Sequence, residues 1–444
     1  MPGRSATNRL IRNLASTTAF QASGYILAML NVPYLTRTLG VADYGVLAFV
    51  ISINAYLFLI IDWGFSLGAT RDIAQAHGDE DVIRGIFWRT MTAKSLLSLA
   101  ALIILFGVAE LNRVPHPIYL VLPGVMNIVA AVLSVDWLVQ GLERMGLFTL
   151  YSIGGRIVVV GLTFLLVHNP GDTWIACALQ GFGSLAGSGA GFLIACRLLK
   201  MGKPRIHFGE AFQQIWDYRH YFLSQSSWIA YSTAAPLFLT FAAGSTSVGL
   251  FAGAERIARI VMALIVPVSI VMYPRVNALI SRSRDAAANV AGPFLALQII
   301  FASAVTLVLF FGAVPIVTII LGAHFGKAAE VLRWLSVLPL LTGVTGTLSR
   351  QFLIPLGWSR EVSRITVVCT LIYLALLAVL CRWMGAPGAA IALISTETLI
   401  TVVFVVFLFR RERAFSTTAT LAVINAPRGL MTLFEGWVGK LRSS

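Results

Sequence analysis

Long apolar runs constrain the fold of this chain more than any other feature of its sequence. A run of about 20 apolar residues forms an α-helix long enough to cross the hydrocarbon core of a bilayer, which is about 30 Å thick. An α-helix also satisfies its own backbone hydrogen bonds, as lipid requires. We expect about twelve such helices, over residues 14–36, 44–65, 91–109, 117–140, 147–167, 173–196, 220–243, 247–274, 294–321, 330–355, 363–384 and 386–409.

The composition is that of a membrane protein. Hydrophobic residues make up 58% of the 444 residues and charged residues 12%, whereas soluble domains carry about 25% charged residues. The mean hydropathy is +0.84. The net charge of +14 does not indicate a nucleic-acid partner, because the basic residues lie at the ends of apolar runs and not beside aromatic residues on a polar domain. The sequence predicts an all-α, polytopic membrane protein.

The positions of the basic residues predict the orientation of the chain. Positive side chains are enriched in cytoplasmic loops of membrane proteins. If the N-terminus is cytoplasmic, most of the 33 basic residues fall in inside segments, and the outside segments hold only Arg37, Arg113, Lys327 and Arg382. We therefore expect both termini on the cytoplasmic side. Lys94 lies near the end of its predicted helix, so we expect its side chain to snorkel to the membrane surface.

A polar connection divides the apolar runs into six and six. The sequence predicts an N-terminal six-helix bundle over residues 1–200 and a C-terminal six-helix bundle over residues 220–413, joined by a cytoplasmic linker over residues 201–219. Residues 414–444 would form a cytoplasmic tail. Its apolar and basic residues fit an amphipathic helix on the inner leaflet, with disorder as the alternative.

The two halves carry the same glycine pattern. The same number of residues separates Gly40 from Gly244, Gly45 from Gly249 and Arg71 from Arg275. Six predicted helices lie between the members of each pair, so both halves would have the same orientation. This indicates a parallel repeat, with a pseudo-two-fold axis along the membrane normal and the substrate path between the halves.

Three charged residues interrupt the apolar run from Val248 to Pro274. Each charge within a bilayer costs about 2.5–3.5 kcal/mol on insertion scales, so such residues usually face a bundle interior or a wet cavity. Glu255 and Arg259 are four residues apart and share a helix face, whereas Arg256 is turned about 100° away from Glu255. We interpret these residues as the wall of a polar cavity. A structural ion pair between helices is the alternative.

Motifs for catalysis, nucleotide binding and metal binding are not found in the sequence. HExxH, GxSxG, Walker A and aspartate-rich patterns do not occur, the four cysteines form no CxxC pair, and the six histidines are scattered. We therefore expect no enzymatic activity, no cofactor and no metal site. Buried charges weighted towards arginine favour an anionic substrate such as a diphosphate. Buried carboxylates can carry protons or sodium, and the candidates in order are Glu255, Glu397 and Asp62.

Four stretches resemble polysaccharide-export flippases of the multidrug/oligosaccharidyl-lipid/polysaccharide exporter superfamily. Residues 32–74 resemble the N-terminal signature of this family, 248–279 its seventh-to-eighth-helix region, and 348–359 its tenth helix. WLVQGLERMG at 137–146 resembles its Trp/Phe-x-x-Gln-Gly-x-Glu pattern. The resemblance covers about residues 10–410. It rests on spacings of glycine, proline and aromatic residues, which specify a family and not a substrate.

The resemblance implies two six-helix bundles arranged as a V around a central cavity. It implies an O-antigen-type flippase that carries an undecaprenyl-diphosphate-linked oligosaccharide across the bacterial inner membrane by alternating access, coupled to protons or sodium. The cavity cations would be Arg156, Arg256 and Arg259. A polysaccharide polymerase and chain-length proteins would be partners, beside membrane lipids.

Two other functions remain open. One is a drug or metabolite antiporter of the same superfamily, whose more acidic cavity fits the arginine excess poorly. The other is an integral-membrane glycosyltransferase, which would need a larger polar loop than the short outer loops predicted here.

Overall fold

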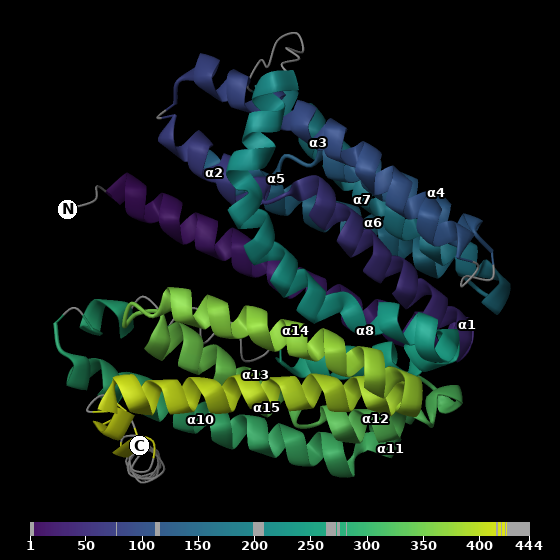
Figure 1. The fold of residues 1–444 in the computed structure, drawn as a ribbon. Coiled ribbons are helices and arrows are strands. Elements are labelled where there is room, and N and C mark those ends of the chain that lie inside the picture. Colours follow the sequence, from purple (N-terminus) through teal and green to yellow (C-terminus); the bar gives the residue numbers. More distant parts are fainter. Residues whose placement is uncertain are drawn as a thin grey trace, which may run out of the picture. The chain divides into compact units, whose positions relative to one another are not determined.

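The computed structural model describes residues 4–76, 78–111, 116–198, 208–262, 272, 276–280, 282–413, 416–418, 420, 421 and 423. Within these residues all regular structure is helical (Figure 1). The predicted all-α fold is therefore confirmed. Arg275, residues 201–207 of the linker and nearly all of the predicted tail lie outside the described residues.

The chain forms two compact units. Unit 1 comprises Met1–Ala252 with Ile320–Phe325, and unit 2 comprises Gly253–Ile319 with Gly326–Ser444. The first part of α8 packs within unit 1, so these units are not the two predicted bundles, and the bundle boundaries stay a prediction.

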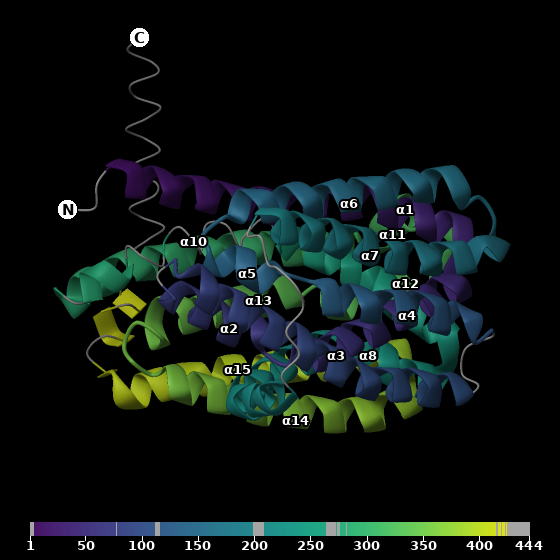
Figure 2. The same ribbon diagram turned by 90° about the horizontal axis from the view of Figure 1, so that it is seen from above.

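The helices of unit 1 begin with the kinked α1. They are α1 (Arg4–Asp62), α2 (Phe65–Gln75), α3 (Glu80–Glu110), α4 (Ile118–Leu133), α5 (Asp136–Gly141), α6 (Met145–Leu166), η1 (Pro170–Asp172), α7 (Thr173–Leu198), the larger part of α8 (Phe208–Met262) and η2 (Ala323–Phe325). Helices α4, α6 and α7 pack together, and α1 lies against α4 and α6 (Figure 2).

Unit 2 holds the end of α8 and the remaining helices. These are α10 (Arg284–Phe311), α11 (Ala313–Ile320), α12 (Ala328–Leu335), α13 (Leu338–Thr347), the π-helical η3 (Leu348–Leu353), α14 (Ser359–Met384) and α15 (Ala386–Arg411). Helix α15 packs on α12, α13 and α14, and α10 packs on α13. Phe352 and Phe404 are both 1% exposed in the apolar core of this unit.

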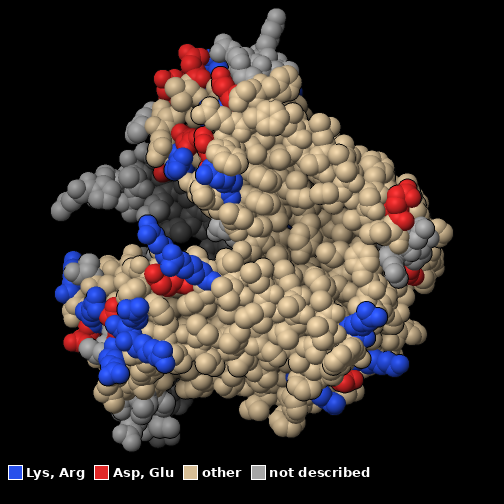
Figure 3. Space-filling model, viewed as in Figure 1, with Lys and Arg blue, Asp and Glu red and all other residues tan. Residues whose placement is uncertain are grey.

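Nine helical stretches of the described chain are long and apolar enough to cross a membrane, and Ser152–Leu166 is a shorter apolar helix. The stretch Ala22–Gln75 contains the second predicted run and most of the first. Gln225–Met262 contains most of the seventh and the beginning of the eighth. The protein is a multi-pass membrane protein, and its helices are consistent with the twelve predicted spans. On the face drawn in Figure 3, the Lys, Arg, Asp and Glu side chains gather in a few patches, and other residues make up most of the surface between them.

Two glycine kinks join pairs of predicted spans. Gly40 in α1 has φ 75° and ψ −177°, and Gly244 in α8 has φ 78° and ψ 174°. Backbone of this kind is essentially restricted to glycine. Beyond the kinks, Gly45 and Gly249 let the two helices touch: a Cβ added to Gly45 would overlap the carbonyl oxygen of Ser245, and one added to Gly249 would overlap that of Val41. This reciprocal contact matches the predicted repeat residue by residue.

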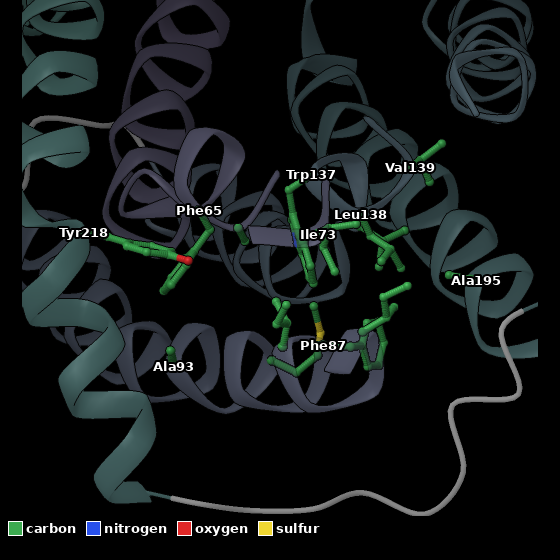
Figure 4. Close-up of a cluster of buried hydrophobic side chains, with 14 of the residues drawn as sticks. Phe65, Ile73, Phe87, Ala93, Trp137, Leu138, Val139, Ala195 and Tyr218 are labelled. Carbon is green, nitrogen blue, oxygen red and sulfur yellow. The ribbon is translucent and has the colours of Figure 1, made fainter. Parts of the chain in front are cut away.

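The apolar core of unit 1 includes the beginning of α8. Tyr218 is 3% exposed and packs edge-on against Phe65, with ring centroids 5.6 Å apart (Figure 4). Its hydroxyl donates to Asp72 of α2 at 2.5 Å. Trp63 donates its indole N–H to the Ile215 carbonyl at 2.8 Å. These contacts fix the part of α8 that precedes its apolar run onto the end of α1 and α2.

Candidate functional site

Glu255 and Arg259 form an ion pair on the part of α8 that belongs to unit 2. The Arg259 Nη2 and Nε atoms lie 2.6 Å and 3.0 Å from the same Glu255 oxygen. The side chains remain 15% exposed for Glu255 and 33% for Arg259. The predicted pairing on one helix face is confirmed. Because Arg259 is only partly buried, its guanidinium keeps access to further ligands.

Arg256 directly follows Glu255 in α8. Its side chain is exposed, whereas the next two residues, Ile257 and Ala258, are buried at 3% and 0%. An exposed guanidinium presents a fork of donors that fits the oxygens of a phosphate group. Arg256 and Arg259 therefore place two guanidinium groups on neighbouring turns of one helix, one of them already paired with a carboxylate.

Arg156 belongs to unit 1, where α6 packs against α1. It is half-buried, and its Nη1 atom lies so close to Gly24 of α1 that an added Cβ there would be 2.8 Å from it. Because Gly24 has no side chain, the Arg156 guanidinium can pack against α1 at this position. Arg156 and Asp62 are described within unit 1, and Glu255, Arg256, Arg259 and Glu397 within unit 2.

Glu397 is a buried carboxylate of α15, 5% exposed. It accepts a long hydrogen bond of 3.4 Å from the Thr345 hydroxyl, and that hydroxyl lies 2.7 Å from the Thr401 hydroxyl. Thr345 is on α13, so this polar group joins two helices inside unit 2. A carboxylate with hydroxyl neighbours can bind a proton or a small cation.

Asp62 ends α1 in a buried setting, with 6% exposure. It accepts from the Ser66 hydroxyl at 2.8 Å, and Gln225 of α8 donates to that hydroxyl at 2.8 Å. Lys94 of α3 is its basic neighbour. Asp62 is therefore part of a hydrogen-bonded group that links α1, α2 and α8 within unit 1.

The expected snorkelling of Lys94 is wrong. This side chain is 0% exposed, and its ammonium donates to Ala131 and Ser134 inside unit 1. The predicted run began at residue 91, whereas α3 is a 31-residue helix that begins at Glu80. Lys94 is therefore near the middle of its helix. The apolar residues before it, Ile83, Ile86 and Phe87, are the sequence signal that points to a longer helix.

No group of three or more His, Cys, Asp or Glu side chains in the described part of the chain has the geometry of a metal site. The buried charges instead form single ion pairs and small hydrogen-bonded groups. Such groups can hold an anion, a proton or a monovalent cation.

Comparison with known proteins gives a consistent result. Residues 10–280 match the family described as "Polysaccharide biosynthesis protein". The chain is 30% identical over 408 residues to the "Putative O-antigen transporter" of Escherichia coli (strain K12), a match that covers 90% of this chain and 97% of that protein. A protein of the same name from Shigella dysenteriae is 25% identical over 398 residues, covering 88% and 97%.

Two solved structures share the fold. The lipid II flippase MurJ, in an inward closed conformation, has a TM-score of 0.70 and 16% identity, and the match covers 95% of this chain and 93% of MurJ. A multidrug resistance MATE family transporter of the MOP superfamily, in an inward-facing conformation, has a TM-score of 0.68 and 16% identity, covering 88% and 96%. These likenesses show a common architecture.

Proposed function

The chain belongs to the polysaccharide biosynthesis protein family, and from this premise we propose that it is a flippase for a lipid-linked oligosaccharide. The observation that carries the proposal is the 30% identity, over 90% of the chain, to a protein named as an O-antigen transporter. The multi-pass fold and its likeness to MurJ support the same function. The protein acts as a transporter and not as an enzyme.

We infer that the substrate is an undecaprenyl-diphosphate-linked oligosaccharide, which moves from the inner to the outer leaflet of the bacterial inner membrane. The diphosphate is the part that this chain can hold, because guanidinium groups bind phosphate oxygens with two parallel hydrogen bonds. Arg256 is the first ligand, since it is exposed, and Arg259 is the second. Arg156 of unit 1 is the third candidate. In this proposal the arginines bind the phosphates and not the sugar or the lipid tail.

The Glu255–Arg259 pair offers a way to couple substrate binding to an ion. While Glu255 is ionised, its carboxylate accepts hydrogen bonds from the Arg259 guanidinium. A proton on Glu255 weakens that ion pair, so that the Arg259 guanidinium can bind the diphosphate instead. Glu397 and Asp62 are the other coupling candidates, and the coupled ion is a proton or sodium. Both termini lie in the cytoplasm, and the partners are membrane lipids, a polysaccharide polymerase and chain-length proteins.

The test is a flipping assay on purified protein in vesicles that contain a fluorescently labelled, diphosphate-linked lipid oligosaccharide. Arg256→Ala and Arg259→Ala should each lower the flipping rate at least tenfold. Loss of one contact with a phosphate during translocation of the substrate costs about 1.5–3 kcal/mol. Arg333→Ala is the matched control, since this exposed arginine of α12 lies in the same unit and outside the proposed site. Flipping at the normal rate by both site variants would refute the assigned role of the arginines.

A deletion strain gives an independent readout of the function itself. Without the protein, the lipid-linked oligosaccharide should accumulate on the cytoplasmic leaflet, and expression of the chain should restore its export. A strain that exports its glycan normally without the protein would remove the basis of the proposal.

A further inference from the structure

The first turns of α8 carry large apolar side chains that unit 1 does not cover. Phe208, Phe212, Trp216 and Leu223 are spaced by four, four and seven residues, which places them along one side of the helix. Their exposed fractions are 57%, 63%, 67% and 60%. A single exposed apolar side chain is ordinary, but four on one side of a helix form a patch that indicates an interaction surface. We call these four residues the apolar stripe.

Another side of the same turns is fixed to unit 1. Ala211 is 0% exposed and Tyr218 is 3% exposed, and both belong to the apolar core of this unit. Gln214 is 4% exposed, and its amide donates to the Thr90 hydroxyl of α3 at 3.1 Å. At about 100° per residue, the middle of the apolar stripe lies about 130° around the helix from these buried residues. The stripe is therefore turned away from the core that holds the helix in place.

The remaining side of these turns is polar. Its exposed residues are Glu210, Gln213, Asp217 and His220. The two acids, Glu210 and Asp217, lie about 160° to 180° around the helix from Arg219, which falls within the apolar stripe. The helix thus has a buried side, an apolar side and a polar side. An apolar side beside a polar side is the pattern of a helix that lies in the interface between lipid and water.

The beginning of α8 does not follow the direction of the neighbouring helix α3. The stretch Glu80–Glu110, which is α3, is long and apolar enough to cross a membrane. The part of α8 that carries Tyr218 runs across α3 and not along it (Figure 4). Further along α8, the stretch Gln225–Met262 is also long and apolar enough to cross. The apolar stripe ends at Leu223, directly before that stretch, so the membrane is the partner nearest to the stripe.

Arg219 brings a positive charge into the apolar stripe. Its guanidinium carbon lies 4.4 Å from the centre of the Trp216 ring, and its Nη1 atom donates to the Trp216 carbonyl at 2.7 Å. Stacking on the indole and this hydrogen bond hold the guanidinium beside the stripe. The bond uses one of the five N–H donors of a guanidinium, and none of the ion pairs within the described residues includes Arg219. Its other donors can bind the oxygens of a phosphate group.

We propose that the beginning of α8 lies on the membrane surface and binds an anionic phospholipid. The apolar stripe enters the outer part of the acyl chains, Arg219 binds the phosphate of the headgroup, and the two acids of the polar side face water. Trp and Arg suit this depth because each has an apolar body and a polar end. The sequence directly before the helix adds Lys200, Lys203 and Arg205, and the inner leaflet, where we expect the linker, attracts such basic segments. The proposal does not depend on which substrate is transported.

The first test measures the effect of the lipid headgroup on stability. The purified protein is placed in nanodiscs of phosphatidylcholine with or without phosphatidylglycerol, and its thermal unfolding is followed. Phosphatidylglycerol should raise the unfolding midpoint of the parent protein by about 2 to 4 °C, and Arg219→Gln should lose at least half of that gain. Arg333→Gln is the control, since it removes the charge of an exposed arginine of α12 and should keep the full gain. No gain in the parent protein, or a full gain in Arg219→Gln, would overturn the headgroup contact.

The second test locates the apolar stripe. Phe212→Cys and Gln213→Cys place a thiol on the apolar side and on the polar side of the same turn, and both positions are exposed. In nanodiscs that hold one copy of the protein, a maleimide that does not enter membranes should label Gln213→Cys at least tenfold faster than Phe212→Cys. The parent protein gives the background from its native cysteines. Equal labelling would overturn the placement in the membrane. Because each nanodisc holds one copy, slow labelling of Phe212→Cys cannot come from contact with a second copy.

Discussion

The kink of α1 and the kink of α8 have nearly the same backbone conformation, but the helical turns that follow them carry different side chains. Gly40 and Gly244 adopt nearly the same dihedral angles, and Gly45 and Gly249 form the two halves of one reciprocal contact. Beyond the contact the sequences diverge: Ile51, Ser52 and Ala55 of α1 hold the positions that Glu255, Arg256 and Arg259 hold in α8.

The difference teaches that the repeat preserves geometry and not chemistry. A backbone that passes within contact distance of another tolerates only glycine, whichever half it belongs to. The following turns have no such restriction, and α8 carries charged residues there where α1 carries uncharged ones. The turns that follow the two kinks therefore carry different side chains on related helices.

The largest effect should come from filling the reciprocal contact. Gly45→Ala and Gly249→Ala each place a methyl group into a backbone carbonyl, and overpacking of this kind costs about 1–3 kcal/mol or more. We expect both variants to unfold at clearly lower temperature in detergent, by similar amounts. Gly161→Ala is the control, because an added Cβ there meets nothing within 4 Å and alanine favours the helix. Equal stability of Gly45→Ala and Gly161→Ala would refute the contact.

The kink glycines should give the next largest effect. A Cβ at Gly40 or Gly244 meets no atom within 4 Å, so the cost of alanine is the backbone strain alone, about 1–3 kcal/mol. Gly40→Ala and Gly244→Ala should therefore destabilise the protein to the same degree, measured as the midpoint of thermal unfolding. A loss confined to one of the two would show that the repeat is not equivalent at its kinks.

Removal of the charge that distinguishes α8 should change stability little and transport strongly. A partly exposed ion pair four residues apart on a helix contributes about 0.3–0.5 kcal/mol, so Glu255→Gln should shift the unfolding midpoint only slightly. Because Arg259 then lacks its carboxylate, the diphosphate substrate should bind more tightly, and the flipping rate should change. Substrate binding by Glu255→Gln and by the parent protein tests this expectation, and equal affinity would exclude a competition between Glu255 and the substrate for Arg259.

The sequence predicted the helical membrane fold and the glycine repeat, because apolar length and glycine spacing are local properties. It did not predict where helices break. The run 117–140 is interrupted at Ser134 and Val135, where neither residue is Gly or Pro. That break is held by distant contacts, since Lys94 binds Ser134 and the Thr70 hydroxyl binds the Trp137 carbonyl. The burial of Lys94 was not predicted because the predicted helix began at residue 91, whereas α3 begins at Glu80. Lys94 therefore lies near the middle of the helix and not near its end.

The smallest effect should come from the α1 counterpart of Arg256. Ser52 is 4% exposed, and its hydroxyl donates to the Ala48 carbonyl of the same helix at 3.0 Å. That carbonyl keeps its helical hydrogen bond without the hydroxyl, and alanine is the better helix former, so Ser52→Ala should change the free energy of unfolding by less than about 0.5 kcal/mol. Flipping should remain at the parent rate, whereas Arg256→Ala should lose it. Because the two positions are equivalent in the repeat, a loss of flipping in Ser52→Ala would mean that the transport function is shared by both halves and does not reside in the charges of α8.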